Sequence, residues 1–488
     1  MVLTYVVIFA AVPLFYTVVT VINLPDIIEC KNNTWNQPTC KAFIYNETLN
    51  DELAKGNIDE KWSLDEIVIY QNLPSYEYFR HHMNVISNEF EDETKISKSF
   101  NRSILLCALI IWAFVYFLHS RGIEWLGRIN RYVTLTLLFI LSIFIVKAFC
   151  TKELLRALRS SFDSRSNRPD NHIQALIAGP TLCIQLFGRG WGTILAMGSH
   201  NQFRTNLTKH TLVLVLMNFL ISFGCSFVTF AFYGILAEVT FHGLTDNNLH
   251  PLEKIFVVVP AVFGNLGSPR LFLFLFFLML TLAETFGIAI QLSSLLSSLF
   301  DEHDKLRHSK REISIGFVLF FIFTTIFYCS GLNNNFFFAI TQFTIPTHVL
   351  MFLLFILVVF WIYGRERFQR DVHFMLEIRF HTALVYMVRF LTPIVCLLVL
   401  LIFGTDLIDN IAFTEFIVAF LLRVLPMLVI PGYMIFALTK TKGPLSSRIR
   451  KLNRPTDWYP VDREEKRKYE EALGQMVEPL AQYGDDLL

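Results

Sequence analysis

A run of alternating glycines around one arginine is the feature of this sequence best suited to chemistry. The run reads Gly188-Arg189-Gly190-Trp191-Gly192 and lies inside an apolar stretch. Each glycine costs a helix about 1 kcal/mol relative to alanine, so the run predicts a break in a helix. Unwound backbone within a membrane exposes N–H and C=O groups that bind ions and zwitterions. The alternative is a packing face, because small residues also let helices approach closely.

Arg189 bears on the choice between a binding site and a packing face, because a charge near the membrane centre costs about 2.5 kcal/mol or more. Such a charge normally faces water, an acid or an anion. The candidate acid is Glu284, in another apolar stretch. Two interpretations stay open: Arg189 binds an anionic group of a ligand, or it forms a structural ion pair with Glu284.

Asn218 and Ser222 are the other polar pair within an apolar stretch. Four residues apart, they share one helical face. Side chains of this kind are either hydrogen-bond partners between helices or ion ligands. No metal-ligand spacing, nucleophile motif or phosphate-binding loop occurs, and His81-His82 has no further ligand nearby. We therefore expect no enzymatic activity and no cofactor.

The composition points to an integral membrane protein. Of 488 residues, 53% are hydrophobic, 49 are Phe and only 17% are charged, whereas a typical globular domain has roughly 25% charged residues. The mean hydropathy is +0.47. The net charge of +1 leaves no basic excess for binding nucleic acid. The expected partners are therefore membrane lipid and a small solute, and the oligomeric state is not indicated.

A helix needs about 20 apolar residues to cross a bilayer. Ten stretches qualify, so we expect an all-α polytopic bundle, although the first stretch could also be a signal peptide. The stretches are 3–23, 102–119, 131–150, 172–203, 210–237, 269–299, 313–330, 336–363, 383–404 and 411–438.

The distribution of basic residues predicts the orientation. If residues 24–101 lie outside, most of the Lys and Arg residues of the short loops lie inside, for example Arg121, Arg204 and Arg370. The segment 151–171 disagrees, with five basic residues outside. The balance favours a cytoplasmic C-terminus. The polar tail 439–488 is expected to be either a solvated helix or a disordered end.

The loop 24–101 carries two glycosylation sequons, at Asn32 and Asn46. We expect both to be glycosylated, since the loop is predicted to be extracellular. Asn101 and Asn206 also begin sequons. The first adjoins the membrane and the second lies in a predicted inside loop, so neither is expected to carry a glycan.

Cys30 and Cys40 are the cysteines in polar sequence, on the side predicted to be oxidising. We expect a disulfide between them, the alternative being two free thiols. The remaining cysteines lie in or beside apolar runs, where each behaves as a small hydrophobe. They are Cys107, Cys150, Cys183, Cys225, Cys329 and Cys396.

Short motifs follow one another along nearly the whole chain. They include Leu24-Pro25, Cys30 to Cys40, Gly188 to Gly192, Ser199 to Phe203, Ala237-Glu238, Ser268-Pro269, Asp301-Glu302, Trp361 to Gly364, Thr392-Pro393 and Ile430 to Met434. In type and order they resemble the neurotransmitter:sodium symporter family. The resemblance implies an inverted-repeat (LeuT-like) transporter fold in which the ten spans are equivalent to family helices three to twelve. The implied organisation is a first membrane helix (1–23), an extracellular glycosylated loop (24–101), a nine-helix membrane bundle (102–438) and a cytoplasmic tail (439–488).

The resemblance also implies roles for single residues. Tyr5 would close over the substrate, and residues Gly188, Arg189, Gly190, Trp191 and Gly192 would line the substrate site. Asn218 would bind sodium and chloride, and Ser222 would bind chloride.

The sequence departs from the family at several ligand positions. The family's first two helices have no counterpart. Its second sodium site uses an aspartate and a serine that fall on Phe286 and Gly287, which cannot replace oxygen ligands. A shift by three residues brings Ala283 and Glu284 to these positions instead. Two chloride ligands correspond to the apolar residues Leu182 and Leu186, and a proline corresponds to Arg189.

By resemblance, the expected function is sodium- and chloride-coupled uptake of an amino acid or amine across the plasma membrane, with incomplete coupling sites. Two alternatives remain open. The protein could be a transport-incompetent scaffold or regulatory partner, or the sequence could be an incomplete transporter. The family resemblance favours the first interpretation, and the missing ion ligands favour the alternatives.

Overall fold

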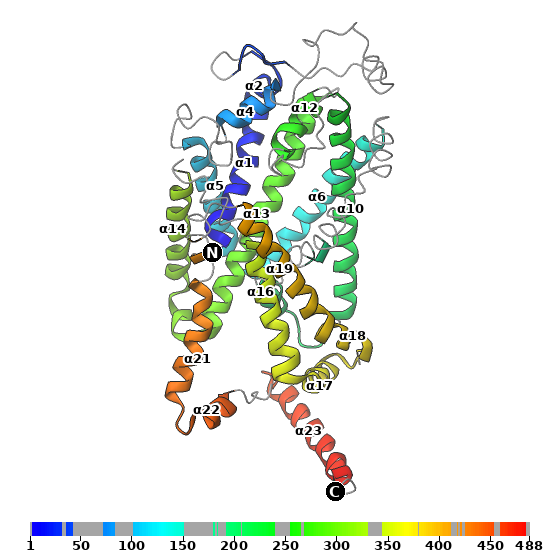
Figure 1. Ribbon diagram of the computed structural model, residues 1–488, viewed down its shortest axis with the longest axis vertical. Helices are drawn as coiled ribbons and strands as arrows, with labels where there is room; N and C mark the ends of the chain where they lie inside the picture. Colours follow the sequence, from blue (N-terminus) through cyan, green and yellow to red (C-terminus); the bar gives the residue numbers. More distant parts are fainter. Residues whose placement is uncertain are drawn as a thin grey trace. The chain divides into compact units, whose positions relative to one another are not determined.

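The computed structural model is helical in every regular element that it describes (Figure 1). The described residues are 2–31, 36–41, 72–82, 101–150, 179–180, 183, 192–205, 207–239, 254–264, 268–329, 344–378, 380–410, 417, 420–421, 425–452 and 459–484. They belong to two compact units. The first comprises Met1–Ala175, Gly192–Met197 and Val213–Gln342, and the second comprises Leu176–Trp191, Gly198–Leu212 and Phe343–Leu488.

Eight helical stretches in the described part of the chain are long and apolar enough to cross a membrane. This confirms a multi-pass, all-α membrane protein. About half of the predicted span at 172–203 lies outside the described residues. The predicted span at 411–438 lies partly outside them, and its described part contains the shorter apolar helix Val429–Lys440. The eight stretches are Val2–Ile22, Arg102–Ser120, Ile123–Phe149, Leu207–Thr229, Pro269–Glu302, Lys305–Tyr328, Thr344–Leu376 and Thr382–Ile402.

The third predicted span begins at residue 131, whereas the helix that contains it begins at Ile123. Helix α6 runs over Ile123–Phe149 and carries Glu124 in its first turn. An acidic side chain there interacts favourably with the helix dipole and supports an early start. The hydropathy pattern marks the apolar part of a helix, and α6 extends about two turns N-terminal to that part, through sequence that mixes apolar and polar residues.

Helix α1 (Val2–Ile22) forms the centre of the first unit. It packs against α5 (Arg102–Ser120), α13 (Pro269–Glu302) and α14 (Lys310–Tyr328). The fully buried ring of Tyr16 lies 4.9 Å from that of Phe277 and 5.0 Å from that of Phe256. Aromatic pairs at such distances stabilise a core beyond their buried area.

A half-buried histidine, His119, joins three helices of this unit. The Ser314 hydroxyl donates to the carbonyl of Lys310 at 2.7 Å, so its oxygen accepts the Nε2 proton of His119 at 3.2 Å. Nδ1 of the ring then accepts a proton from the hydroxyl of Ser293, 3.0 Å away. These partners assign one neutral tautomer and connect α5, α13 and α14.

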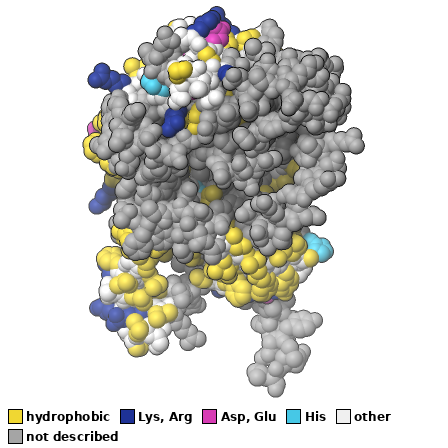
Figure 2. Space-filling view, turned by 45° about the horizontal axis from the view of Figure 1, so that its top comes forward, with side chains coloured by type: hydrophobic (Ala, Val, Ile, Leu, Met, Phe, Trp, Pro, Cys, Tyr) yellow, Lys and Arg dark blue, Asp and Glu magenta, His cyan; other side chains and the backbone are white. Residues whose placement is uncertain are grey.

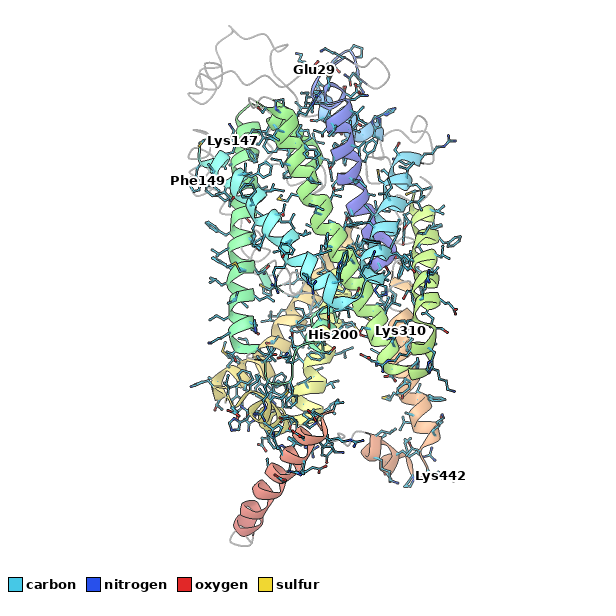
Figure 3. All side chains as sticks on the ribbon, turned by 180° about the vertical axis from the view of Figure 1, so that it is seen from behind. Glu29, Lys147, Phe149, His200, Lys310 and Lys442 are labelled. Atoms are coloured by element: carbon cyan, nitrogen blue, oxygen red, sulfur yellow. A yellow bond between two sulfur atoms is a disulfide. The ribbon has the colours of Figure 1, made fainter. Side chains whose placement is uncertain are left out.

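Helix α6 packs against α13, and its C-terminal end also contacts α10 (Leu207–Val239). Figure 3 labels two residues at this end, Lys147 and Phe149. The ring of Phe149 lies 4.5 Å from Phe227 of α10, and the ammonium of Lys147 lies 5.6 Å from the ring of Phe272 on α13.

Four short elements cover one end of the first unit. They are α2 (Pro25–Ile28), α4 (Pro74–His82), η4 (Lys254–Val258) and α12 (Val259–Gly264). The buried hydroxyl of Ser75 donates to the carbonyl of Val257 at 2.9 Å. Glu77 accepts the backbone N–H of Gln37 at 3.2 Å, which ties α4 to the loop that contains the disulfide.

The second unit begins with one long, irregular helical stretch. It consists of α16 (Thr344–Leu357), the π-helical η6 (Val358–Gly364) and α17 (Arg365–Leu376). Gly364 has a φ of +101°, which other residues rarely adopt, and so permits the change of direction into α17.

The remaining elements of this unit follow in order. They are α18 (Thr382–Tyr386), η7 (Met387–Leu391), α19 (Thr392–Asn410), η8 (Leu425–Leu428), α21 (Val429–Lys440), α22 (Leu445–Leu452) and α23 (Arg463–Gly484). Helices α16 and α19 bury a small core together, formed by Val349, Leu353, Cys396 and Val399.

Large hydrophobic side chains are exposed along many of these helices. Helix α10 exposes Leu212 at 70%, Phe219 at 63% and Phe223 at 64%. Figure 2 shows such side chains in yellow on the visible face. A soluble protein rarely exposes contiguous apolar surface on this scale. The exposure agrees with helices that face lipid.

Candidate functional site

The predicted substrate site is only partly within the described residues. Tyr5 is buried on α1 and lies edge-on to Phe9, with 6.3 Å between ring centroids. Gly192 has a φ of +73° and precedes the short helix α9 (Thr193–Gly198). A left-handed residue at this point agrees with a break in helical structure after the glycine run. Residues 188–191, including Arg189, lie outside the described part.

Asn218 and Ser222 lie one turn apart on α10, and both are half-buried. The described part of the chain contains no hydrogen-bond partner for either side chain. Their side chains lie on one helical face, as a shared role in ion binding would require. Leu182 and Leu186, which correspond to the other chloride ligands, lie outside the described residues.

In the gap-free match to the family, Phe286 corresponds to a ligand of the second sodium site, whereas a shift by three residues brings Ala283 and Glu284 to the two ligand positions. Phe286 is 4% exposed on α13 and lies 6.2 Å from Phe114 of α5, with the rings edge to face. Its neighbour Gly287 has no side chain. Sodium is a hard cation that needs several oxygen ligands, so this position does not fit the ion. Glu284 supplies a carboxylate two residues earlier, at an exposed position of the same helix.

The disulfide and sequon predictions have different outcomes. Cys30 and Cys40 are joined in a disulfide, with 5.9 Å between their Cα atoms, as expected. Asn32 and Asn46 lie outside the described residues. The side chain of Asn101 caps α5 by accepting the Ile104 N–H at 3.1 Å, and its amide nitrogen donates to the His82 carbonyl at 2.6 Å. That nitrogen is the atom a glycan would modify, so its engagement agrees with the prediction that Asn101 is unmodified.

His81 and His82 belong to a packed helix end. The described residues contain no group of three potential metal ligands. The His82 ring stacks on Tyr78 with 4.1 Å between centroids, and its Nδ1–H donates to the Tyr78 carbonyl at 3.2 Å. Burial, together with the nearby His81, lowers the pKa of His82 to about 4. The ring is therefore neutral at physiological pH.

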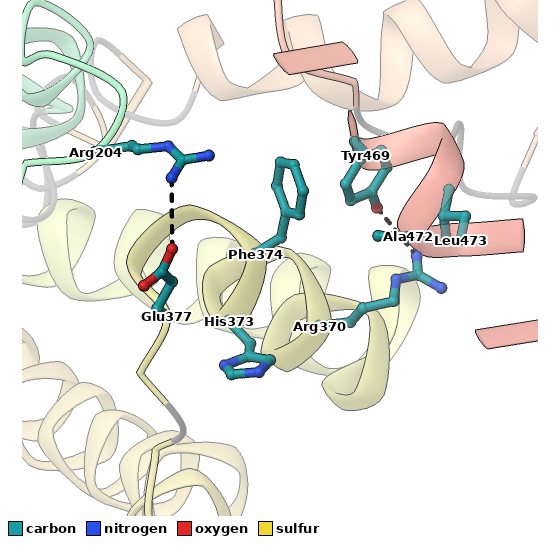
Figure 4. Close-up of a pocket in the computed structure, with 8 residues that line it drawn as sticks. All are labelled: Arg204, Arg370, His373, Phe374, Glu377, Tyr469, Ala472 and Leu473. Atoms are coloured by element: carbon teal, nitrogen blue, oxygen red, sulfur yellow. Dashed lines mark hydrogen bonds and ion pairs between the residues drawn. The ribbon is translucent and has the colours of Figure 1, made fainter. Parts of the chain in front are cut away.

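A second polar site lies in the second unit, where α23 packs against α17. The Tyr469 hydroxyl donates to one oxygen of Asp371 at 2.5 Å, and the Tyr363 hydroxyl donates to the other. Both Asp371 and Tyr469 are buried. A guanidinium nitrogen of Arg370 lies 3.4 Å from the Tyr469 hydroxyl, an interaction drawn in Figure 4.

Arg204 adds a second connection to the same site. Its guanidinium donates to Glu465 of α23 at 2.9 Å. It also donates to Glu377, directly after α17, at 3.4 Å, an interaction drawn in Figure 4. The hydrogen bond from Arg204 lowers the pKa of Glu465 below its usual value. A cavity of about 250 Å³ lies beside these contacts, lined in part by His373 and Phe374.

Sequence reasoning anticipated a helical tail among its alternatives but missed this contact. Tyr469 lies in the run Arg463 to Glu471, in which all the remaining residues are charged. A single aromatic side chain within such a run was the available signal, because a fully solvated helix has no need of it. Asp371 carried no comparable signal, since acidic residues are common in polar loops.

The chain is similar to known sodium-dependent transporters. The model of the "Sodium:neurotransmitter symporter family" matches residues 1–441. The serotonin transporter of Drosophila melanogaster is 27% identical over 56% of this chain and 44% of its own length. The creatine transporter 1 of Mus musculus is 24% identical over 87% of this chain and 67% of its own length. The glycine transporter 1 of Xenopus laevis is 24% identical over 88% of this chain and 69% of its own length.

The match extends over both compact units and over all eight apolar stretches. The chain spans less than half the length of the serotonin transporter and about two thirds of that of the other two relatives. From the family match and the helical membrane fold, the chain belongs to the sodium:neurotransmitter symporter family.

Proposed function

We propose that this protein is a secondary-transporter-like membrane protein that moves a small amino-acid-like or amine solute across the plasma membrane. The family match over residues 1–441 carries the proposal. Relatives are named as transporters of serotonin, creatine, glycine and betaine. These are small amines and zwitterions, so the proposed solute belongs to the same chemical class.

The proposed solute site combines Tyr5 of α1 with the glycine run at 188–192. Tyr5 would close over the solute, and the backbone around Gly192 would supply dipoles to it. Arg189 would bind a carboxylate of the solute with two parallel hydrogen bonds, in place of a sodium charge. Asn218 and Ser222 would bind chloride, and Asn218 would also bind sodium.

The proposed coupling to sodium is incomplete. Coupling requires that an ion binds one access state more tightly than the other. In the gap-free match the buried Phe286 would offer no oxygen to the second sodium, and in the match shifted by three residues Ala283 would offer none at the same ligand position. We therefore expect uptake that depends weakly on a sodium gradient.

The second candidate function is a transport-incompetent scaffold or regulatory partner in the membrane. The same observation on Phe286 favours it. The two candidates differ in whether a solute crosses the membrane at all, and not only in how strongly its movement is coupled.

The orientation is part of the proposal. The basic residues of the short loops favour a cytoplasmic C-terminus, and the disulfide between Cys30 and Cys40 favours an extracellular loop around it. Glycans at Asn32 and Asn46 would lie in the same loop. Glycosidase treatment tests this arrangement. It should shift the gel mobility of the original protein, and the double variant Asn32→Gln with Asn46→Gln should not show this shift.

Purified protein in liposomes tests the function. Radiolabelled glycine, betaine, creatine and serotonin are offered with an inward sodium gradient and without one. Saturable uptake of one solute, reduced in Tyr5→Ala but not in Arg128→Ala at an exposed position, supports transport. No uptake of any solute, from protein that is folded and correctly inserted, supports the scaffold. Strict dependence on sodium contradicts the incomplete coupling.

A further inference from the structure

Tyr469 is the buried residue through which α23 contacts α17. Among the described side chains of this helix, at 463–474, it is the only buried one. Its ring lies edge-on to Phe374 of α17 at 5.0 Å, and its hydroxyl bonds to Asp371. The other side chains of this part of α23 are exposed or half-buried, so the docking of the helix depends strongly on a single phenol.

The surroundings of this phenol carry an excess of acidic groups. Three carboxylates lie at the contact, those of Asp371, Glu377 and Glu465. Two guanidiniums, of Arg204 and Arg370, are already bonded to them. A further negative charge on the Tyr469 oxygen would therefore meet repulsion, most directly from Asp371.

The sequence around Tyr469 is charged on both sides of the tyrosine. Glutamates occupy positions 464, 465, 470 and 471, and basic residues occupy positions 463, 466, 467 and 468, so this run has no net charge. Three of the glutamates are exposed, whereas Glu465 bonds to Arg204.

We propose that Tyr469 is a site of tyrosine phosphorylation and that the modification keeps α23 away from α17. A tyrosine kinase transfers the γ-phosphoryl group of ATP to the phenol oxygen. The new O–P bond forms as the bond between the γ-phosphorus and the bridging oxygen breaks, ADP leaves, and the phenol proton passes to solvent. The product has lost the proton donated to Asp371 and carries a charge of about −1.5 to −2.

The order of events follows from burial. Tyr469 is 1% exposed while α23 is docked, so a kinase reaches the hydroxyl only after the helix has separated from α17. Phosphorylation then opposes the return of the helix, because the phosphate would face Asp371. The inference uses the proposed cytoplasmic position of the tail, where kinases and ATP are found, but does not depend on transport activity.

The first test measures the rate of modification in the full chain, purified in detergent. A tyrosine kinase catalytic domain and Mg-ATP are added, and mass spectrometry follows the modification of Tyr469. Tyr459, which is 41% exposed in the same tail, reports general reactivity. Loss of a hydrogen bond to a charged group in Asp371→Ala should raise the initial rate at Tyr469 by about tenfold.

Asp371→Ala also removes the partner of Tyr363, so a milder pair of variants is needed. Glu465→Gln weakens the contact with Arg204 and should increase the rate, whereas Glu464→Gln should not. The two variants remove the same charge from the kinase recognition sequence and differ in the docking contact. Equal rates in the two variants contradict the inference.

The second test measures docking by hydrogen exchange of the amides at 463–474. Phosphorylated protein should exchange faster there than unmodified protein, and at least as fast as Tyr469→Phe, which keeps the ring and loses the hydroxyl. Unchanged or slower exchange after phosphorylation overturns the proposal, because Arg204 and Arg370 would then retain the phosphate in the adjacent cavity. The proposal also fails if Tyr469 stays unmodified in Asp371→Ala while Tyr459 reacts.

Discussion

The indole nitrogen of Trp112 on α5 donates to the hydroxyl oxygen of Thr325 on α14, 3.1 Å away. Thr325 in turn donates to the carbonyl of Phe321 at 2.8 Å, so its hydroxyl proton is already used. Trp112 and Thr325 are both fully buried. The indole N–H therefore depends on this one oxygen, and the bond fixes the lateral position of two membrane helices.

Thr325→Val removes that oxygen at almost constant volume and leaves a buried donor unpaired. The free energy of unfolding should fall by about 1 kcal/mol. This value lies between the cost of leaving a donor unpaired in a soluble protein core and the smaller cost of losing a hydrogen bond between membrane helices. Thr325→Ser keeps the oxygen and is the matched control. Unfolding in mixed micelles measures the change, and equal losses in the two variants would remove the hydrogen bond as the cause.

The neutral state of His82 predicts an acid-sensitive α4. Burial lowers its pKa to about 4 from an ordinary value of 6.5, so the opened helix binds a proton that the packed helix excludes. The stabilisation is complete above pH 6.5 and is lost as the pH falls toward 4. His81 has a pKa lowered by burial and acts in the same direction.

Hydrogen exchange of the α4 amides, corrected for intrinsic rates, measures this loss. His82→Gln cannot take up the proton and should flatten most of the dependence between pH 6.5 and 4. The carboxylate of Asp26 favours the charged ring and limits the effect. A profile of the same steepness in His82→Gln would assign the acid sensitivity to another group.

Glu377 offers a test of how two opposing effects balance. It ends α17 with a φ of +56°, a conformation that costs a residue with a side chain roughly 1–2 kcal/mol. Its ion pair with Arg204 joins side chains that are 79% and 51% exposed, and such pairs contribute about 0–1 kcal/mol. Glu377→Gly should therefore stabilise the second unit slightly, whereas Glu377→Ala should destabilise it. Melting temperatures of the two variants should lie on opposite sides of that of the unmodified protein.

The sequence predicted the membrane helices well, because each is specified by its own apolar residues. The predicted spans 102–119 and 269–299 agree with α5 and α13 to within a few residues. The docking of α23 could not be predicted in this way. Asp371 and Tyr469 are 98 residues apart in the chain, and their contact depends on how two polar helices meet. Hydropathy and periodicity describe single elements and carry no information on such a meeting.

The same distinction applies to the candidate site. The position of Phe286 on a buried face of α13 could be predicted from the apolar run, and the structure agrees. The tautomer of His119 could not be predicted from the sequence, since it depends on hydroxyls contributed by two other helices. Polar contacts between distant helices are the part of this fold that needs coordinates.

Arg189 remains the sharpest test of the proposed solute site. If it binds a solute carboxylate, Arg189→Ala should lower the affinity for glycine or betaine while the melting temperature stays nearly unchanged. If it pairs with Glu284, the single change should destabilise the protein, because an acid within a membrane-spanning helix is left uncompensated. Adding Glu284→Ala should then recover much of the loss. Strong mutual rescue would discard the binding role, and Arg128→Ala controls for the loss of a positive charge.

The hydrogen bond of Tyr469 predicts an alkaline release of α23. Burial, assisted by the bond to the Asp371 carboxylate, raises the pKa of the Tyr469 phenol to about 12 from an ordinary value of 10. The docked helix thus holds the proton more tightly than the released helix, so docking is fully stable below pH 10 and weakens as the pH rises toward 12. The difference in tyrosinate absorbance between unmodified protein and Tyr469→Phe isolates this one titration, and a midpoint near pH 12 is expected. The same difference recorded in an Asp371→Asn background should move toward pH 10, because an amide repels the phenolate less than a carboxylate does. A midpoint near pH 10 in both backgrounds would show that the carboxylate does not hold the phenol proton.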